Sequence, residues 1–174
     1  MKLWNFEKYA ERTAVVTEDG REFRYAELDL LRQKLALHIK SRTLTVLLAD
    51  NDLGSLIGYI TCLSCDSVPI LLPAEKENPK IQEMITRYHP EYIWLSETMS
   101  EEVLGETEYT YQIHFSFLTY HLLVRNSWMH HPLCPELALL LPTSGSTGNP
   151  KLVRISQANI LVRWYNKVVT PILE

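Results

Sequence analysis

The chain has 174 residues, of which 46% are hydrophobic and 22% are charged, and its formal net charge is -4. A chain of this length buries roughly 70% of the surface that its unfolded form exposes, so it can form one domain with its own core. The composition excludes a disordered or fibrous protein. Because no segment is dense in Lys and Arg, a nucleic-acid partner is also excluded.

The N-terminus and the cysteines bear on the cellular compartment. Glu7 stands where a signal peptide has its apolar core, and the sequence contains no window of 18 apolar residues. The three cysteines are an odd number, which does not favour a disulfide framework. We therefore expect a cytoplasmic protein with reduced thiols and no membrane span.

The first elements in chain order are expected to be a β-hairpin and a helix. Residues 14–17 and 23–25 read as strands around the turn signal at 18–21, in which Gly20 tolerates a positive φ. Leucines at 28, 31, 35 and 37 then predict an amphipathic helix over residues 25–40.

Two βα units are expected next. The apolar run 44–49 is typical of a buried parallel strand, and residues 50–52 supply N-cap candidates for a helix that reaches about residue 65. A strand at 68–72, a helix over about 79–89 and a strand at 92–95 repeat the pattern. Right-handed crossovers would make these strands parallel. The predicted fold class is therefore α/β, with a mostly parallel sheet and flanking helices.

The stretch from residue 96 to 135 is the hardest to interpret, and its details stay open. The acids at 101, 102, 106 and 108 are most simply a solvated face, and residues 114–121 read as a strand with period-2 aromatics. The pattern sharpens at 137–141, a buried-strand run that ends at Pro142. Residues 151–155 predict a second strand, and Ser156 is an N-cap candidate for a helix to about residue 169.

The segment that joins these two strands carries the chemistry. It reads Thr143-Ser144-Gly145-Ser146-Thr147-Gly148-Asn149-Pro150-Lys151. Its two glycines allow the backbone N–H groups to turn inward as an anion-binding nest, and its hydroxyls add further donors. Lys151 adds a mobile positive charge, and Pro150 fixes φ. These groups predict a phosphate-binding loop over residues 142–151.

Other phosphate motifs fit this segment less well. The P-loop of common NTPases needs four residues between its first glycine and a Gly-Lys pair, whereas Lys151 follows a proline. The dinucleotide-binding fingerprint is also absent. A solvent-exposed turn rich in hydroxyl residues is the remaining alternative. The order of strand, loop, β-branched strand and capped helix argues against that alternative.

The segment resembles the phosphate-loop signature of the adenylate-forming enzymes, which include acyl-CoA synthetases, aryl-CoA ligases and the adenylation domains of peptide synthetases. Residues 23–28, Phe-Arg-Tyr-Ala-Glu-Leu, resemble an early strand-to-helix segment of the same family, and residues 65–73 resemble its "A-G-A-V-P-V-x-L-P" segment. The resemblance covers almost the whole chain. Three positions depart from the family pattern: Asp66 replaces a glycine, Leu152 replaces the glycine after the lysine, and Gln157 replaces a histidine.

The resemblance implies an AMP-forming acid–thiol ligase or adenylation enzyme. In such enzymes the carboxylate of a small-molecule acid attacks the α-phosphorus of ATP, pyrophosphate leaves, and the acyl group passes to CoA or to the phosphopantetheine arm of an acyl-carrier protein. Mg²⁺ bridges the phosphates. The implied nucleotide-binding residues are Thr143, Ser144, Gly145, Ser146, Thr147, Gly148 and Lys151, and Lys151 would also offset charge during the reaction.

The resemblance also implies how much of the enzyme is present. Residues 1–174 correspond to the N-terminal subdomain of the large AMP-binding domain, and the adenine-, ribose- and metal-binding segments and the C-terminal lid would follow it. We therefore expect the isolated chain to be inactive. The alternative is a non-catalytic relative that binds a nucleotide or a partner through the same loop. A reading frame that continues into those motifs would favour the enzyme.

Two other clusters deserve a hypothesis. Cys62 and Cys65 have C-x-x-C spacing, and His131 and Cys134 would complete a four-ligand zinc site. Since the two cysteines end an apolar helical run, core packing is the simpler interpretation, and we predict no bound metal. The histidines at 114, 121, 130 and 131 are likewise explained by packing or solvent rather than by catalysis.

Overall fold

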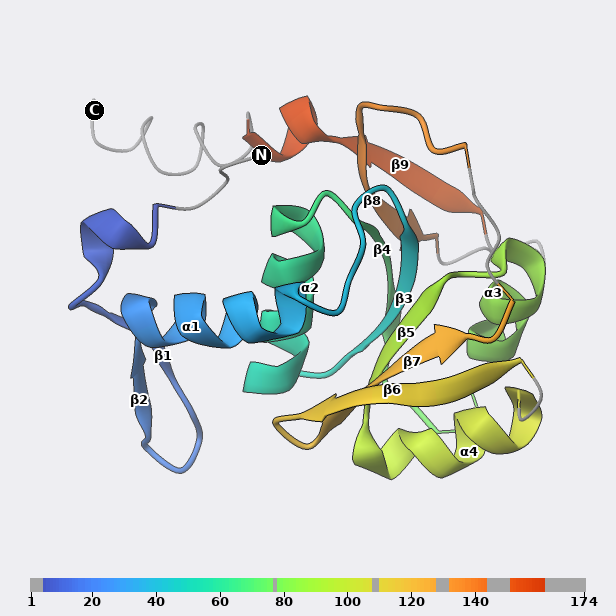
Figure 1. Cartoon of the computed structure of the whole chain (residues 1–174), viewed down its shortest axis with the longest axis horizontal. Helices are drawn as coiled ribbons and strands as arrows, with labels where there is room; N and C mark the ends of the chain where they lie inside the picture. Colours follow the sequence, from blue (N-terminus) through green and yellow to red (C-terminus); the bar gives the residue numbers. More distant parts are fainter. Residues whose placement is uncertain (1–4, 77, 108–109, 128–131, 144–150, 162–174) are drawn as a thin grey trace.

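The protein, described here from a computed structural model, forms three layers, with a seven-stranded sheet between two pairs of helices (Figure 1). The structure describes residues 5–76, 78–107, 110–127, 132–143 and 151–161. One helical layer contains α1 (Tyr25–Ala36) and α2 (Leu53–Ser64), and the other contains α3 (Pro79–Tyr88) and α4 (Glu97–Thr107). The predicted α/β class with flanking helices is confirmed.

The sheet has the strand order β6-β7-β5-β3-β4-β8-β9. Strands β3, β4, β5 and β8 are mutually parallel, whereas β7 pairs antiparallel with β5 and β6, and β9 pairs antiparallel with β8. The strand bounds are β3 Leu44–Ala49, β4 Val68–Pro73, β5 Tyr92–Ser96, β6 Tyr111–Phe117, β7 Tyr120–Arg125, β8 Leu137–Pro142 and β9 Leu152–Ser156.

Both faces of the central strands are buried, which explains their continuous apolar runs. Successive side chains of a strand point to opposite faces, so Val46 and Leu48 of β3 join the core under α3 and α4. Leu47 of the same strand and Trp94 of β5 join the core under α1 and α2. Each of these four side chains is fully buried.

The N-terminal region packs beside α1. A short 3-10 helix, η1 (Glu7–Tyr9), precedes the hairpin of β1 (Thr13–Val16) and β2 (Glu22–Arg24), in which Gly20 has φ 81°. Helix α1 begins where the Glu27 side chain accepts a hydrogen bond from the backbone N–H of Arg24. It ends four residues before the predicted residue 40, because the chain turns there and buries Ile39 at the entrance to β3.

Caps define the next two helices. Asp52 accepts a hydrogen bond from the backbone N–H of Ser55 at the start of α2, as its position before the helix predicts. Asn78 caps α3, whose first residue is Pro79, and the C-cap after Tyr88 is His89, which has φ 45°. The predicted strand–helix units are confirmed to within one or two residues.

The stretch left open by the sequence contains α4 and the hairpin of β6 and β7. The prediction of one strand over residues 114–121 is wrong, because Leu118 and Thr119 form a two-residue turn with φ 53° and 59°. Two successive positive φ values are usual for the pairs Asn-Gly and Asp-Gly. The turn here is Leu-Thr, so the sequence carries no hairpin signal. Within the described parts of the chain, no helix is long and apolar enough to cross a bilayer.

Candidate functional site

The 143–151 segment closes the hairpin of β8 and β9. Pro142 of β8 is paired with Leu152 of β9, and just beyond them the backbone N–H of Thr143 donates to the carbonyl of Lys151 over 2.8 Å. The two ends of the predicted phosphate loop are therefore held together at the carboxyl edge of the parallel strands. The remaining residues of the loop lie outside the described part of the chain: Ser144, Gly145, Ser146, Thr147, Gly148, Asn149 and Pro150.

The base of this loop has one side buried in the core and one side exposed to solvent. Leu139 and Leu140 of β8 are 6% and 7% exposed, and Leu140 is paired with Ile70 of β4. Leu152 packs against the same core, which gives a reason for a large apolar side chain after the lysine. Lys151 itself is exposed, and within the described residues no hydrogen bond or ion pair engages its side chain.

The other two departures from the family pattern contact each other at the opposite edge of the sheet. Asp66 precedes β4 with φ 60°, a conformation that Asp tolerates better than most residues. Its Oδ1 accepts a hydrogen bond from Nε2 of Gln157 over 3.0 Å and lies 3.3 Å from Nη1 of Arg42. Arg42 also donates to the carbonyls of Cys134 and Leu137. Arg42 therefore joins the turns before β3, β4 and β8 at the amino edge. Gln157 is bonded to one of these turns, far from the 143–151 loop along β9.

The cysteines occupy three different environments. Cys62 is fully buried in the core under α2, and burial raises the pKa of its thiol to about 12. Cys65 is half-buried, and burial also raises its pKa, whereas Cys134 is exposed. His131, the remaining residue of the zinc hypothesis, lies outside the described residues. Among the residues that are described, no group of three or more His, Cys, Asp or Glu side chains could hold a metal ion.

The described histidines make surface contacts. His114 of β6 lies 3.4 Å from His38, measured from Nε2 to Nδ1, and the ring of His38 stacks on Phe115 with centroids 3.9 Å apart. His121 of β7 pairs through Nδ1 with the hydroxyl of Ser116 over 2.8 Å. Packing and local hydrogen bonds account for these side chains, as expected. His130 and His131 are outside the described residues.

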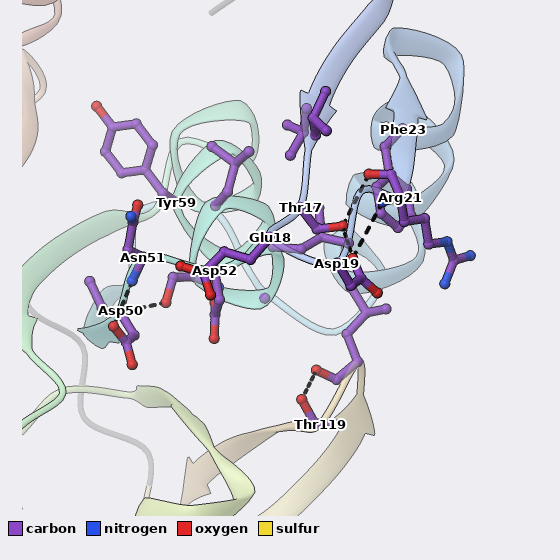
Figure 2. A pocket seen from close by; sticks show the side chains of 18 of the residues that line it. Thr17, Glu18, Asp19, Arg21, Phe23, Asp50, Asn51, Asp52, Tyr59 and Thr119 are labelled. Carbon is purple, nitrogen blue, oxygen red and sulfur yellow. Dashed lines mark hydrogen bonds between the residues drawn. The ribbon is translucent and has the colours of Figure 1, made fainter.

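The structure also contains a pocket that the sequence did not predict. A pocket of about 930 Å³ opens at the carboxyl end of β3, between the turn of the β1–β2 hairpin, the start of α2 and the turn of the β6–β7 hairpin (Figure 2). Residues 50–52 were interpreted only as N-cap candidates and residues 18–21 only as a turn. Nothing in the sequence indicates that these two segments, more than twenty residues apart, line the same pocket.

Hydrogen bonds from two buried aromatic side chains support one wall of this pocket. The hydroxyl of Tyr120 donates to both carboxylate oxygens of Asp52, at 2.9 and 2.8 Å, and burial raises the pKa of Tyr120, so the phenol stays protonated. The indole N–H of Trp94 donates to the carbonyl of Gly54 over 3.0 Å, and the rings of Trp94 and Tyr120 stack 5.2 Å apart. The start of α2 is thus fixed to β5 and β7.

Comparisons with known proteins agree with this architecture. Bacitracin synthase 2 of Bacillus licheniformis is 25% identical over 163 residues, which cover 89% of this chain and 6% of that protein. The O-succinylbenzoate coenzyme A synthetase MenE of Bacillus subtilis, solved with AMP, superimposes with a TM-score of 0.61 at 16% identity, over 94% of this chain and 44% of MenE. McyG A-PCP, solved with phenylalanyl-adenylate, superimposes with a TM-score of 0.62 at 19% identity, over 90% of this chain and 27% of McyG A-PCP.

The two structural matches show a shared fold, and the chain spans less than half the length of each of these relatives. The family model described as "AMP-binding enzyme" matches residues 3–171, nearly the whole chain. The chain therefore belongs to the family of AMP-binding enzymes.

Proposed function

We propose that residues 143–151 bind the β- and γ-phosphates of ATP in an enzyme that activates a small carboxylic acid as its acyl-adenylate. The observation that carries this proposal is the closed base of the β8–β9 hairpin, from which the exposed Lys151 emerges at the carboxyl edge of the sheet. Membership of the AMP-binding family supports it. So do the ligands of the two similar structures, AMP in MenE and phenylalanyl-adenylate in McyG.

The proposed role of the loop is to position and to stabilise charge. The acid's carboxylate oxygen attacks the α-phosphorus, the bond to the β-phosphate oxygen breaks, and pyrophosphate leaves with its negative charge. Lys151, the hydroxyls of Thr143, Ser144, Ser146 and Thr147, and the backbone around Gly145 and Gly148 would hold the leaving group in line and offset that charge. Mg²⁺, which prefers oxygen ligands and phosphates, would accompany the nucleotide.

The acceptor of the acyl group belongs to the same proposal. The resulting adenylate would pass its acyl group to the thiol of CoA or of a carrier protein's phosphopantetheine arm, and AMP would leave. The similarity to a coenzyme A synthetase supports the first acceptor, and the similarity to an A-PCP protein supports the second. A chain of residues 1–174 alone is proposed to catalyse neither adenylate formation nor pyrophosphate exchange.

The test is the affinity of the purified chain for ATP and for pyrophosphate, measured by titration calorimetry. Replacing Lys151 with Ala removes a charge-assisted contact worth about 1.5–3 kcal/mol, so we expect affinity to fall roughly 10- to 100-fold. Lys151→Arg keeps the charge and should retain most of the affinity. Lys80→Ala, on the exposed side of α3, is the matched control. Equal affinities of the Lys151→Ala variant and the parent chain would contradict the proposal.

Catalysis is tested separately by ATP–pyrophosphate exchange. A protein that carries this chain together with the remaining length of the family is assayed against a panel of fatty, aryl and amino acids, and the 174-residue chain is assayed beside it. We expect acid-dependent exchange in the longer protein alone. ATP binding without exchange for any acid would favour a non-catalytic nucleotide-binding protein.

A further inference from the structure

The pocket at the end of β3 lies where the connections of the sheet diverge. From β3 the chain leaves through α2 to β4 on one face of the sheet, and α3 then carries it back across β3 to β5 on the other face (Figure 1). In open α/β sheets, ligands bind in the crevice that such a divergence leaves at the carboxyl ends of the strands. Asp50 follows β3, and the carbonyl of Thr119 accepts a hydrogen bond from the N–H of Glu97, which follows β5. Both Asp50 and Thr119 line the pocket.

The size and the lining of the pocket fit a small organic molecule. Its volume of about 930 Å³ lies within the range of roughly 300–1,000 Å³ that is usual for ligand sites in proteins. Apolar side chains from three elements and one turn form its inner surface: Val15, Phe23, Leu53, Leu56, Tyr59 and Leu118. A ligand with an aliphatic or aromatic body would bury apolar surface against them.

The charged groups around the pocket are mainly acidic. Glu18, Asp19, Asp50 and Asp52 line it together with one cation, Arg21, so the lining carries four negative charges, one positive charge and a net charge of -3. The hydrogen bond from the Thr17 hydroxyl holds the pKa of Asp19 below its usual value, and this carboxyl stays ionised.

The single cation, Arg21, acts on the neighbouring Asp19 but cannot neutralise four acids. The guanidinium of Arg21 lies 4.6 Å over the ring of Phe23, and in Figure 2 its side chain extends away from residues 50–52. Among the described residues, no ion pair engages the carboxylate of Glu18, which also lines the pocket. The net negative charge therefore remains available to a ligand.

The start of α2 brings its own partial positive charge to the pocket, equivalent to about half an elementary charge. Asp52 already compensates this charge, because its carboxylate accepts hydrogen bonds from the Ser55 N–H and from the Tyr120 hydroxyl. Asp50 accepts a hydrogen bond from the backbone N–H of Asn51 over 2.7 Å, and Asp19 accepts from the Thr17 hydroxyl and the Arg21 N–H, so both carboxylates are charged but locally bonded. Glu18, Asp19 and Asp50 do not cap α2 as Asp52 does. An anion would meet these three carboxylates, whereas a cation would be attracted by them.

We propose that this pocket binds a small organic cation, an ammonium group attached to an apolar body, at the divergence between β3 and β5. The ammonium lies between Glu18 and Asp50, and the apolar body packs against the inner surface that includes Leu56 and Tyr59. This site is separate from the 143–151 loop and does not depend on the proposed reaction with ATP.

The test compares three ligands that share one apolar body, with the 174-residue chain in the absence of nucleotide. They are 4-phenylbutylamine, 4-phenylbutanol and 4-phenylbutanoate, titrated by calorimetry and by ¹H–¹⁵N chemical-shift mapping. We expect the amine to bind roughly tenfold more tightly than the alcohol, the carboxylate to bind most weakly, and the preference for the amine to shrink as salt rises. The shifted amides should belong to residues 17–19 and 50–52 and not to Thr143 or Lys151.

Substitutions test whether Glu18 and Asp50 cause the preference for the amine. Glu18→Gln and Asp50→Asn replace exposed residues and should each weaken the amine about threefold, with roughly a tenfold loss in the double variant. Val16→Lys, at a side chain that is 60% exposed, places a cation at the pocket and should abolish amine binding without unfolding the chain. Glu101→Gln on α4 is the matched control. Equal affinity for amine and alcohol, or unchanged amine binding in the double variant, would overturn the proposal.

Discussion

Two glycines of α2 allow the close contact between that helix and the sheet. A Cβ added to Gly54 would lie 2.3 Å from ring atoms of Tyr120, and one added to Gly58 would lie 2.3 Å from the indole of Trp94. Both aromatic side chains are fully buried and hold hydrogen bonds to the start of α2. They cannot withdraw without losing those bonds, so a larger residue at either position forces the helix away from the sheet.

We predict that Gly58→Ala lowers the free energy of unfolding by about 1–3 kcal/mol, the usual cost of overpacking a core. Gly105→Ala is the control, because nothing lies within 4 Å of a Cβ at that position of α4 and alanine has the higher helix propensity. It should stabilise the chain by about 0.5–1 kcal/mol. Urea unfolding monitored by tryptophan fluorescence measures both. A Gly58→Ala chain with an unchanged midpoint would show that the helix shifts at no cost.

The Asp66–Gln157 contact gives a second prediction at this scale. Asp66→Ala removes the acceptor of Gln157 and Arg42 while it keeps the positive φ, so we expect a loss of about 1–2 kcal/mol in the free energy of unfolding. Asp66→Gly relaxes the backbone and should lose less. A double-mutant cycle with Gln157→Ala should give a coupling free energy of at least about 0.5 kcal/mol. Strictly additive effects would mean that the hydrogen bond does not contribute to stability.

At the scale of elements, a pair of histidines connects the end of α1 to β6. Burial lowers the pKa of His38 below its usual value, and the neighbouring His114 lowers it further. Above the unfolded-state pKa of about 6.5 both states hold a neutral ring, so no stability is lost there. As pH falls below that value, the unfolded chain binds the proton first. The contact between α1 and β6 therefore loses stability between pH 6.5 and the lower folded-state pKa.

We predict that His38→Gln removes this part of the pH dependence of the unfolding midpoint, compared between pH 7 and pH 5.5. In the unmodified chain, NMR titration of the ring should place the pKa of His38 below 6.5, and His114→Gln should raise it. His121→Gln on β7 is the control, because His121 pairs with Ser116 instead. A normal pKa for His38 would show that the pair is not held in the folded chain.

At the scale of the whole molecule, the two edges of the sheet have different roles. The carboxyl edge carries the base of the 143–151 loop and the acidic pocket beside β3, whereas the amino edge carries the Arg42, Asp66 and Gln157 contacts that join the turns. The core between them is closed on both faces by helices. Global unfolding is therefore needed to expose groups at the centre of the sheet.

The reactivity of the cysteine thiols can be used to detect global unfolding. We predict that a thiol reagent at pH 8 labels Cys134 quickly and Cys65 more slowly, while Cys62 stays unlabelled until the chain unfolds, since its side chain is fully buried and its pKa is about 12. Mass spectrometry of digested chains identifies the labelled residue, and Cys134→Ser serves as the control. Labelling of Cys62 before unfolding by urea would show that α2 opens locally.

The sequence by itself determined the family and most of the architecture. The apolar runs of β3, β4, β5 and β8, the caps Asp52 and Asn78, and the turn at Gly20 are local signals, so the βα units follow from short-range physics. The 143–151 segment is likewise contiguous, and its composition and order were sufficient to predict phosphate chemistry. The role of its residues stays a prediction.

Only the tertiary structure decided which distant residues meet. The Leu118–Thr119 turn has no glycine or asparagine that would predict its two positive φ values. The turn leads into Tyr120 and Leu122 of β7, which are buried under α1 and α2. The meeting of Glu18 with Asp50 in one pocket and of Asp66 with Gln157 across 91 positions depends on how the strands are ordered in the sheet. Strand order is set by long-range pairing and burial, which no local pattern encodes.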